Sequence, residues 1–225
     1  MANQLDLEEQ EQLDQLKHFW KQYGNAITWA LIAVLAAFAS WNFYQYWQRS
    51  QATQAAALFD EVERSIESAD PAKIERVFSE MKDRFGGTIY AWQTALLVAK
   101  QWADADKPAQ AKAALTWVVE QSSDKSYQAL AKLRLAAILM DEKNHDAALV
   151  QLNSEFPASF DALVADRKGD LMVLKADKAK AIAEYEKSWR LLDARTEYRR
   201  LVEVKLNALG VNVQERDQAA LLAGK

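Results

Sequence analysis

The 225-residue chain contains no cysteine and only two histidines, three prolines and six glycines. Without cysteine it can form no disulfide framework, zinc-thiolate site or cysteine nucleophile. The two histidines, His18 and His145, lie far apart and leave little material for a Ser-His-Asp triad or a histidine-rich metal site. Scarce glycine and proline among many alanines, leucines, lysines and glutamates favour helices over a strand-rich sandwich. We therefore expect an all-α chain.

An excess of basic charge is also missing. The formal net charge of the chain is −4, and the first 21 residues carry five acidic side chains against two lysines, for a local charge of −3. Non-specific binding of nucleic acid depends on a dominant basic field. This composition excludes nucleic acid as the expected partner.

Charged residues and histidine are absent from residues 22–48. Within this stretch, residues 26–44 are apolar except for Thr28, Ser40 and Asn42. Nineteen helical residues span about 28 Å, close to the roughly 30 Å of a bilayer's hydrocarbon core. We predict one transmembrane helix over residues 22–48, anchored at the two lipid–water interfaces by aromatic rings. The predicted interface anchors are Trp20, Tyr23, Trp41, Tyr44 and Trp47.

Two other interpretations of this stretch are a buried core helix and a cleaved signal peptide, since Ala37-Phe38-Ala39 resembles a cleavage site. A signal peptide begins with a short basic region, whereas this chain begins with a long acidic one, so a retained anchor is favoured. Lys17 and Lys21 precede the segment and Arg49 follows it, which places the N-terminus inside. Residues 1–21 then form an acidic cytoplasmic tail, and a solvated tail is favoured there over a docking helix.

After residue 48 the sequence repeats. Three small residues, at positions 99, 136 and 169, are each followed 12 positions later by alanine and 4 positions after that by a large side chain. The three units are Ala99-Ala111-Leu115, Ala136-Ala148-Leu152 and Gly169-Ala181-Tyr185. Helix pairs repeating at about 34 residues, small where the helices touch, are similar to the tetratricopeptide repeat. We expect a tetratricopeptide-like α-solenoid over residues 49–209, whose first part is a weaker hairpin over residues 48–85 that joins the membrane helix to the array.

Helix ends are marked along this region. Asp70-Pro71 predicts an N-cap with proline at the first helical position, Pro108 opens another helix, and Pro157 lies between two helices. A helix over residues 196–209 is expected to cap the array and to end at Gly210 in a left-handed conformation. Residues 210–225 then form a C-terminal tail.

Catalytic motifs are absent: the sequence has no phosphate-binding or dinucleotide-binding glycine loop, no nucleophile elbow and no zinc-protease motif. Its paired carboxylates fall at predicted turns or on exposed helix positions, where solvated charge is the ordinary interpretation. His145 is interpreted as a solvated turn residue. We predict no catalytic, metal or cofactor site and therefore a protein that is not an enzyme.

A surface remains. In a tetratricopeptide array the first helix of each pair lines a concave groove, and extending the usual groove positions through the small residues predicts a partner or peptide surface of mixed apolar and charged character. An alternative is that the apolar members complete the core. The predicted groove residues are Leu96, Lys100, Leu133, Met140, Asp166, Asp170 and Val173.

The order of these features, with the stretch LKHFWKQYGN at residues 16–25 and VADRKGD at residues 164–170, resembles the YfgM family, ancillary subunits of the bacterial Sec translocon. The resemblance implies an inner-membrane protein with a cytoplasmic N-terminus and periplasmic repeats. It implies as partners the SecYEG translocon, the membrane-anchored chaperone PpiD, unfolded or emerging secretory proteins and the lipid bilayer. A scaffold that links envelope complexes without binding clients is the alternative function.

Overall fold

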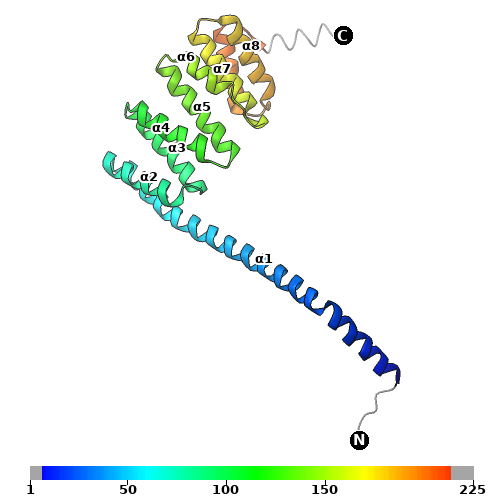
Figure 1. Ribbon diagram of the computed structural model, residues 1–225. Helices are drawn as coiled ribbons and strands as arrows, with labels where there is room; N and C mark the ends of the chain where they lie inside the picture. Colours follow the sequence, from blue (N-terminus) through cyan, green and yellow to red (C-terminus); the bar gives the residue numbers. More distant parts are fainter. Residues whose placement is uncertain (1–6, 214–225) are drawn as a thin grey trace, which may run out of the picture. The chain divides into compact units, whose positions relative to one another are not determined.

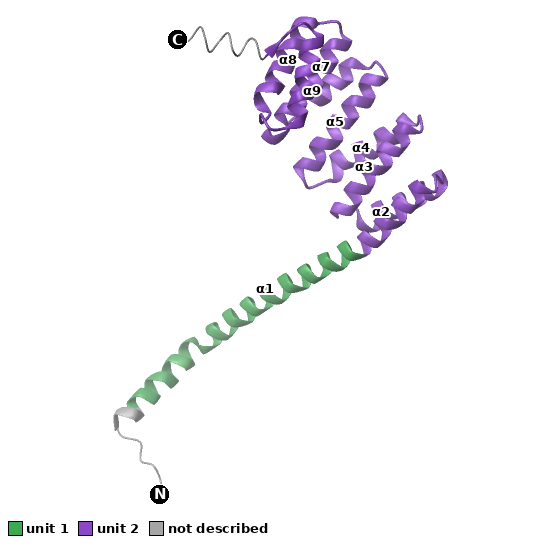
Figure 2. Ribbon diagram, turned by 180° about the vertical axis from the view of Figure 1, so that it is seen from behind, with its two compact units in different colours: residues 1–53 green, residues 54–225 purple. Residues whose placement is uncertain are grey.

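The structure, a computed structural model, describes residues 7–213, and these residues form helices with no strand (Figure 1). The chain divides into two compact units, residues 1–53 and 54–225 (Figure 2). The all-α prediction is confirmed. Residues 1–6 and 214–225, which belong to the two predicted tails, lie outside the described residues.

The first unit contains most of α1, a helix that runs over Leu7–Glu67. The sequence favours a frayed, solvated tail for residues 1–14; residues 7–14 are instead helical, and residues 11–14 are exposed as expected of a solvated segment. The physical reason is local: this stretch contains good helix formers and no proline, and the first glycine, Gly24, is a single helical position. Composition had marked a boundary at residue 49, but the backbone stays helical through it.

The second unit contains the end of α1 and a succession of shorter helices. In chain order they are α2 (Pro71–Phe85), α3 (Ile89–Asp104), α4 (Pro108–Gln121), α5 (Lys125–Asp141), α6 (His145–Leu152), the short 3₁₀ helix η1 (Ala158–Phe160), α7 (Asp161–Leu174), α8 (Lys178–Leu191) and α9 (Glu197–Ala208). Helix α3 packs against α4, α5 against α6, and α7 against α8, as the repeat predicts. Neighbouring pairs pack on each other through α4 and α5 and through α6 and α7.

The predicted helix ends are largely confirmed. A side-chain oxygen of Asp70 accepts hydrogen bonds from the backbone N–H groups of Ala72 and Lys73, both at 3.1 Å. Pro71 and Pro108 open α2 and α4. Gly210 follows α9 with φ of 81°, the left-handed conformation that favours glycine. The interpretation of His145 as a turn residue is wrong, because Asn144 caps α6 and His145 is its first residue.

The three small residues of the repeat lie at close helix crossings. Ala99 and Ala136 share buried clusters with the predicted partners on the second helix of each pair, and Gly169 lies against Tyr185; all six partner residues are at most 3% exposed: Ala111, Leu115, Ala148, Leu152, Ala181 and Tyr185. Glycine is required in the third unit, because a Cβ at Gly169 would lie 2.4 Å from the ring of Tyr185. The larger ring replaces the leucine of the other units and leaves no room for alanine.

The turn within each pair repeats as well. One non-glycine residue with positive φ stands between α1 and α2, between α3 and α4, between α5 and α6, and between α7 and α8. These residues are Ala69, Asp106, Lys143 and Ala176, with φ between 50° and 62°. They are separated by 37, 37 and 33 residues, which is the offset of the small residues extended by one unit toward the N-terminus. The end of α1 and α2 therefore form a fourth hairpin with the same turn.

The core of the second unit is continuous along the array. One cluster of buried side chains joins the end of α1 to α2, α3, α4 and α5, and Leu139 also packs against the next cluster, around α5, α6 and α7. Met172 packs against that second cluster and against a third around α8 and α9. Val202 and Leu206 of α9 are fully buried in the third cluster. The last helix thus closes the apolar end of the array, as expected for a capping helix.

Candidate functional site

Three hollows lie along the first helices of the pairs in the second unit. The first hollow, about 480 Å³, is lined by α1, α3 and α5 and includes Leu96, Leu97 and Lys100. The second hollow, about 250 Å³, is lined by α5, α7 and α9 and includes Leu133 and Leu163. The third hollow, about 370 Å³, opens between α3 and α5 beside Ala137. We call these three hollows together the groove.

A single register relates the groove to the repeat. Counted from the small residues at 99, 136 and 169, four lining positions recur, at six, three and two residues before and one residue after. These four positions share one face of a helix. On α3 they are Gln93, Leu96, Leu97 and Lys100, and on α5 they are Leu130, Leu133, Arg134 and Ala137. On α7 the positions six and two residues before Gly169 are Leu163 and Arg167.

The predicted groove residues fall in two sets. Leu96, Lys100 and Leu133 line the three hollows, and the two leucines are 5% and 7% exposed, so they form floor rather than rim. The remaining four residues do not line these hollows. Met140 is buried in the core between α5 and α6, Val173 is 44% exposed near the end of α7, and Asp166 and Asp170 belong to an ionic network described below.

The position two residues before each small residue also lines the groove and was not predicted. It carries Leu97, Arg134 and Arg167 in the three units. The repeat could have indicated it, because the position lies one turn of helix before the position of Lys100. The groove residues that were not predicted also include Gln93, Tyr127, Leu130, Leu163 and Tyr198.

Arg134 stands where the three hollows meet, since it lines each of them. Its Nη1 donates a hydrogen bond to the backbone carbonyl of Leu96 at 2.9 Å. Burial lowers the pKa of its guanidinium from the ordinary value. Among residues 7–213 no carboxylate lies within ion-pair distance of this guanidinium. The groove therefore holds a half-buried cation whose partner within the described chain is a carbonyl.

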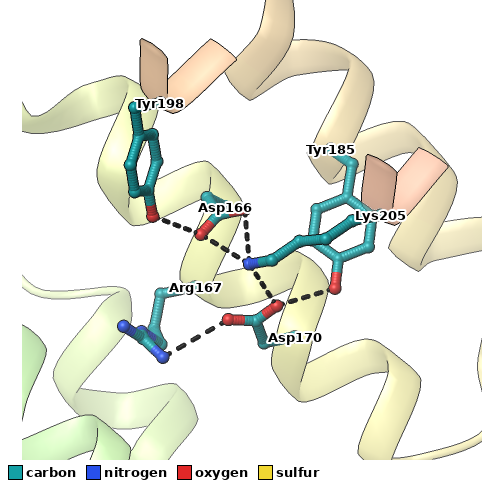
Figure 3. A network of polar contacts seen from close by, with 6 residues as sticks. All are labelled: Asp166, Arg167, Asp170, Tyr185, Tyr198 and Lys205. Atoms are coloured by element: carbon teal, nitrogen blue, oxygen red, sulfur yellow. Dashed lines mark hydrogen bonds and ion pairs between the residues drawn. The ribbon is translucent and has the colours of Figure 1, made fainter. Parts of the chain in front are cut away.

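An ionic network fastens α9 to α7 (Figure 3). Lys205 of α9 donates to both carboxylate oxygens of Asp166 at 2.8 Å and to Asp170 at 2.7 Å. Tyr198 donates to Asp166 at 2.6 Å, and Tyr185 of α8 donates to Asp170 at 2.7 Å. Asp166 is 1% exposed, so its charge is compensated inside the protein rather than by water. Asp166 and Asp170 therefore bind α8 and α9, at the C-terminal end of the array, instead of lining the groove.

The two tyrosines of the network resist ionisation. Burial raises the pKa of Tyr185 and Tyr198 far above the ordinary value of 10.0. The hydrogen bonds that they donate to Asp170 and Asp166 raise these pKa values further, since a phenolate could not donate and would repel the carboxylate. Neutral phenols at these two positions are part of the packed end of the array.

In the first unit, the apolar segment of α1 presents its side chains outward. Among the described residues α1 is the one helix long and apolar enough to cross a bilayer, with a mean hydropathy of 1.7 in its most apolar stretch. The side chains of the five predicted interface anchors are 47% to 63% exposed: Trp20, Tyr23, Trp41, Tyr44 and Trp47. So large an exposed apolar surface calls for cover by lipid or protein.

The polar side chains within this segment bond to their own helix. Thr28 donates to the carbonyl of Gly24 at 2.7 Å, Ser40 to that of Ala36 at 2.8 Å, and Asn42 to that of Phe38 at 2.9 Å. Each bond spans four residues along α1. Polar groups in hydrocarbon must be satisfied inside the protein, and these three have internal partners. The segment is therefore suited to a bilayer in chemistry as well as in length.

Comparison with known proteins agrees with this architecture. Residues 17–211 match the family described as tetratricopeptide repeat-like domain. A protein of Neisseria gonorrhoeae named ancillary SecYEG translocon subunit is 31% identical over 204 residues, which cover 90% of this chain and 98% of that protein. Proteins of the same name from Haemophilus influenzae and Escherichia coli are 30% and 25% identical, over 81% and 90% of this chain and 89% and 97% of their own lengths.

The match to the repeat-like family extends from the start of the apolar segment to the end of α9. The relatives are matched along nearly their whole length, so the similarity includes the apolar helix as well as the repeats. The chain therefore belongs to the YfgM family of ancillary SecYEG translocon subunits, with a tetratricopeptide repeat-like domain.

Proposed function

We propose that this chain is a non-enzymatic accessory subunit of the Sec translocon, held in the inner membrane by α1. Its N-terminus lies in the cytoplasm and its repeat domain lies in the periplasm. There the groove binds emerging secretory proteins, partner chaperones such as PpiD, or both. The observation that carries the proposal is the groove itself: adjoining apolar hollows on the first helices of a repeat array whose chain also carries an exposed apolar helix.

The geometry supports binding of an extended polypeptide. The hollows adjoin one another, because the first and second share Leu130 and Arg134 and the first and third share Lys100 and Arg134. Their floor is made of leucines, which accept varied apolar side chains, and their rim carries donors and acceptors. An anchor beside the channel would raise the effective concentration of the groove near emerging chains, so weak binding would suffice.

Site-specific photocrosslinking in cells tests this function. A photoreactive residue at position 100, where the side chain of Lys100 is 66% exposed and lines two hollows, is expected to capture secretory proteins during export. The matched control is position 150, because Val150 is 69% exposed on α6 and lies outside the groove. Adducts with clients at position 100 and none at position 150 are the expected result.

The alternative is a scaffold that links envelope complexes and never contacts clients. It predicts that position 100 yields adducts only with folded partner subunits, with or without protein export. If blocking export leaves every adduct at position 100 unchanged, the client-binding function is wrong and the scaffold remains.

A further inference from the structure

The groove contains one feature that the general proposal does not use, the half-buried cation at its centre. Arg134 lines all three hollows and donates to the carbonyl of Leu96, with no ion pair to any residue in 7–213. An arginine carries five N–H donors in a planar fork that matches a carboxylate. A half-buried guanidinium without a counter-charge is open to a ligand that supplies one, because a carboxylate there makes charge-assisted hydrogen bonds that are stronger than neutral ones.

The other cations of the groove already have partners within the chain. Arg167, at the equivalent position of the next unit, forms an ion pair with Asp170 at 3.3 Å. Lys100, at the edge of the first and third hollows, pairs with Asp104 one turn along α3. Among the described residues that line the groove, Arg134 is thus the one cation without an ion pair, at the point where the hollows meet.

The surroundings of Arg134 restrict the ligand further. Apolar side chains flank it on both sides, with Leu96, Leu97 and Leu130 in the first hollow and Leu133 and Leu163 in the second. Glu63 lines the first hollow and Asp141 lines the third, so a run of acidic residues would meet like charge. Because hollows continue on both sides of Arg134, a bound chain can pass it in both directions and need not end there.

We propose that the groove is selective for extended peptides in which a single acidic side chain, clasped by the Arg134 guanidinium, stands between apolar residues. This inference rests on the proposed function, because it requires that the groove bind polypeptide. It adds a specificity-determining residue and the chemical class of the recognised segment.

A double-mutant cycle with synthetic peptides tests the proposal. The full chain in lipid nanodiscs is titrated with two fluorescent peptides, both acetylated and amidated at their ends, that carry leucine and valine around a central Glu or a central Gln. Wild-type protein is expected to bind the Glu peptide about tenfold more tightly than the Gln peptide, the size of one charge-assisted hydrogen bond. Arg134→Gln is expected to abolish this preference while leaving affinity for the Gln peptide within about twofold.

Two further variants serve as controls. Lys180→Gln removes a cation on α8 that is 72% exposed and outside the groove, and it is expected to leave both affinities unchanged. Arg134→Lys keeps the charge without the fork, so it is expected to weaken the Glu peptide while retaining some preference for it. This variant decides the question if Arg134→Gln lowers the melting temperature.

The outcomes separate the two proposals. If wild-type protein binds both peptides equally, or if Arg134→Gln weakens both peptides alike, the charge selectivity is wrong while peptide binding stands. If neither peptide binds wild-type protein, the proposed function fails as well. A third peptide with a free terminal carboxylate and a central Gln distinguishes another source of the same chemistry: tighter binding that depends on Arg134 would show that the groove reads chain ends and would overturn the proposal of an internal acidic residue.

Discussion

The apolar segment of α1 and the repeat domain contain the same kinds of side chain in opposite surroundings. Val34 in the segment is 66% exposed, whereas Val62, farther along the same helix, is fully buried in the core of the second unit. In the segment apolar side chains are exposed on all sides of the helix, while the repeat helices bury most of theirs in clusters between neighbouring helices. The composition of each region therefore indicates what surrounds its apolar side chains: lipid around the apolar segment of α1, and neighbouring helices in the repeat domain.

The largest effect is expected from a substitution that disrupts the ionic network between α7 and α9 in the repeat domain. Asp166→Ala removes a carboxylate that is 1% exposed and leaves Lys205 and Tyr198 without their shared acceptor. We expect the free energy of unfolding to fall by about 3 to 5 kcal/mol, toward the lower end because Asp170 still pairs with Lys205. Thermal unfolding of the solubilised full chain, followed by circular dichroism, measures it.

The matched control is Asp104→Ala, which removes an exposed partner of Lys100 and is expected to cost less than about 1 kcal/mol. Equal losses in the two variants would mean that the network at the end of the array contributes no more than a surface pair.

Whether the apolar segment of α1 lies in lipid is tested by placing one charge in that segment and one in the repeat domain. Val34→Arg is expected to weaken membrane insertion by about 3 kcal/mol, because arginine is costly at the centre of a spanning helix. Val204→Arg is the control, since Val204 is 62% exposed on α9 and meets water there. Alkaline extraction of membranes followed by immunoblotting measures the retained fraction. Equal retention of the two variants would contradict a lipid-facing segment.

The close crossing of α7 and α8 is tested by Gly169→Ala. The new Cβ would lie 2.4 Å from the Tyr185 ring, which its hydrogen bond to Asp170 holds in place. We expect a loss of about 1 to 2 kcal/mol after the gain in helix propensity is included. Gly87→Ala is the control, because a Cβ there meets nothing within 4 Å. A stabilised Gly169→Ala variant, measured by its melting temperature, would show that the crossing is loose.

The raised pKa of Tyr198 gives stability a dependence on alkaline pH. The folded chain retains a phenol proton that the unfolded chain releases near pH 10. The contribution of Tyr198 to the free energy of unfolding is therefore complete below pH 10 and is lost as pH rises above it. Tyr198→Phe is expected to cost about 1 kcal/mol at pH 8, through the hydrogen bond to Asp166, and to lose less stability above pH 10. Melting temperatures of wild type and variant should therefore converge between pH 8 and 11, and a constant difference would contradict the account.

The smallest effect concerns the repeated turn. Ala176 has φ of 57°, so Ala176→Gly is expected to stabilise the chain by about 0.5 to 1 kcal/mol by removing left-handed strain. Ala183→Gly, at an exposed position inside α8, is expected to destabilise it by about 1 kcal/mol. Opposite shifts in the melting temperature confirm the turn, and a loss in both variants would refute the strain at Ala176.

Much of the fold could be predicted from local signals. Asp70-Pro71 and Gly210 marked helix ends because capping depends on neighbouring backbone groups, and the triplet Gly169, Ala181 and Tyr185 marked a crossing because contact requires small against large. The continuity of α1 could not be predicted, since a change from lipid-suited to amphipathic composition leaves helix propensity unchanged. Propensity reports on the backbone, while composition reports on the surroundings.

The candidate site was only partly predictable for a different reason. Helical register places Leu96, Lys100 and Leu133 on the groove, because register is a local property. It could not separate Asp166 from a groove residue, since the partner that buries its charge, Lys205, stands 39 residues farther on. Charge pairing across helices depends on tertiary packing, so it could not be predicted from the sequence alone.

The most direct test of the account is the side of the membrane on which each region lies. Single cysteines replace Gln12 and Lys180 in this cysteine-free chain, both at exposed positions, and intact cells with a permeabilised outer membrane are treated with a membrane-impermeant thiol reagent. The account predicts labelling at position 180 and none at position 12 until the inner membrane is opened. Labelling at position 12 alone would place the repeat domain in the cytoplasm and contradict it.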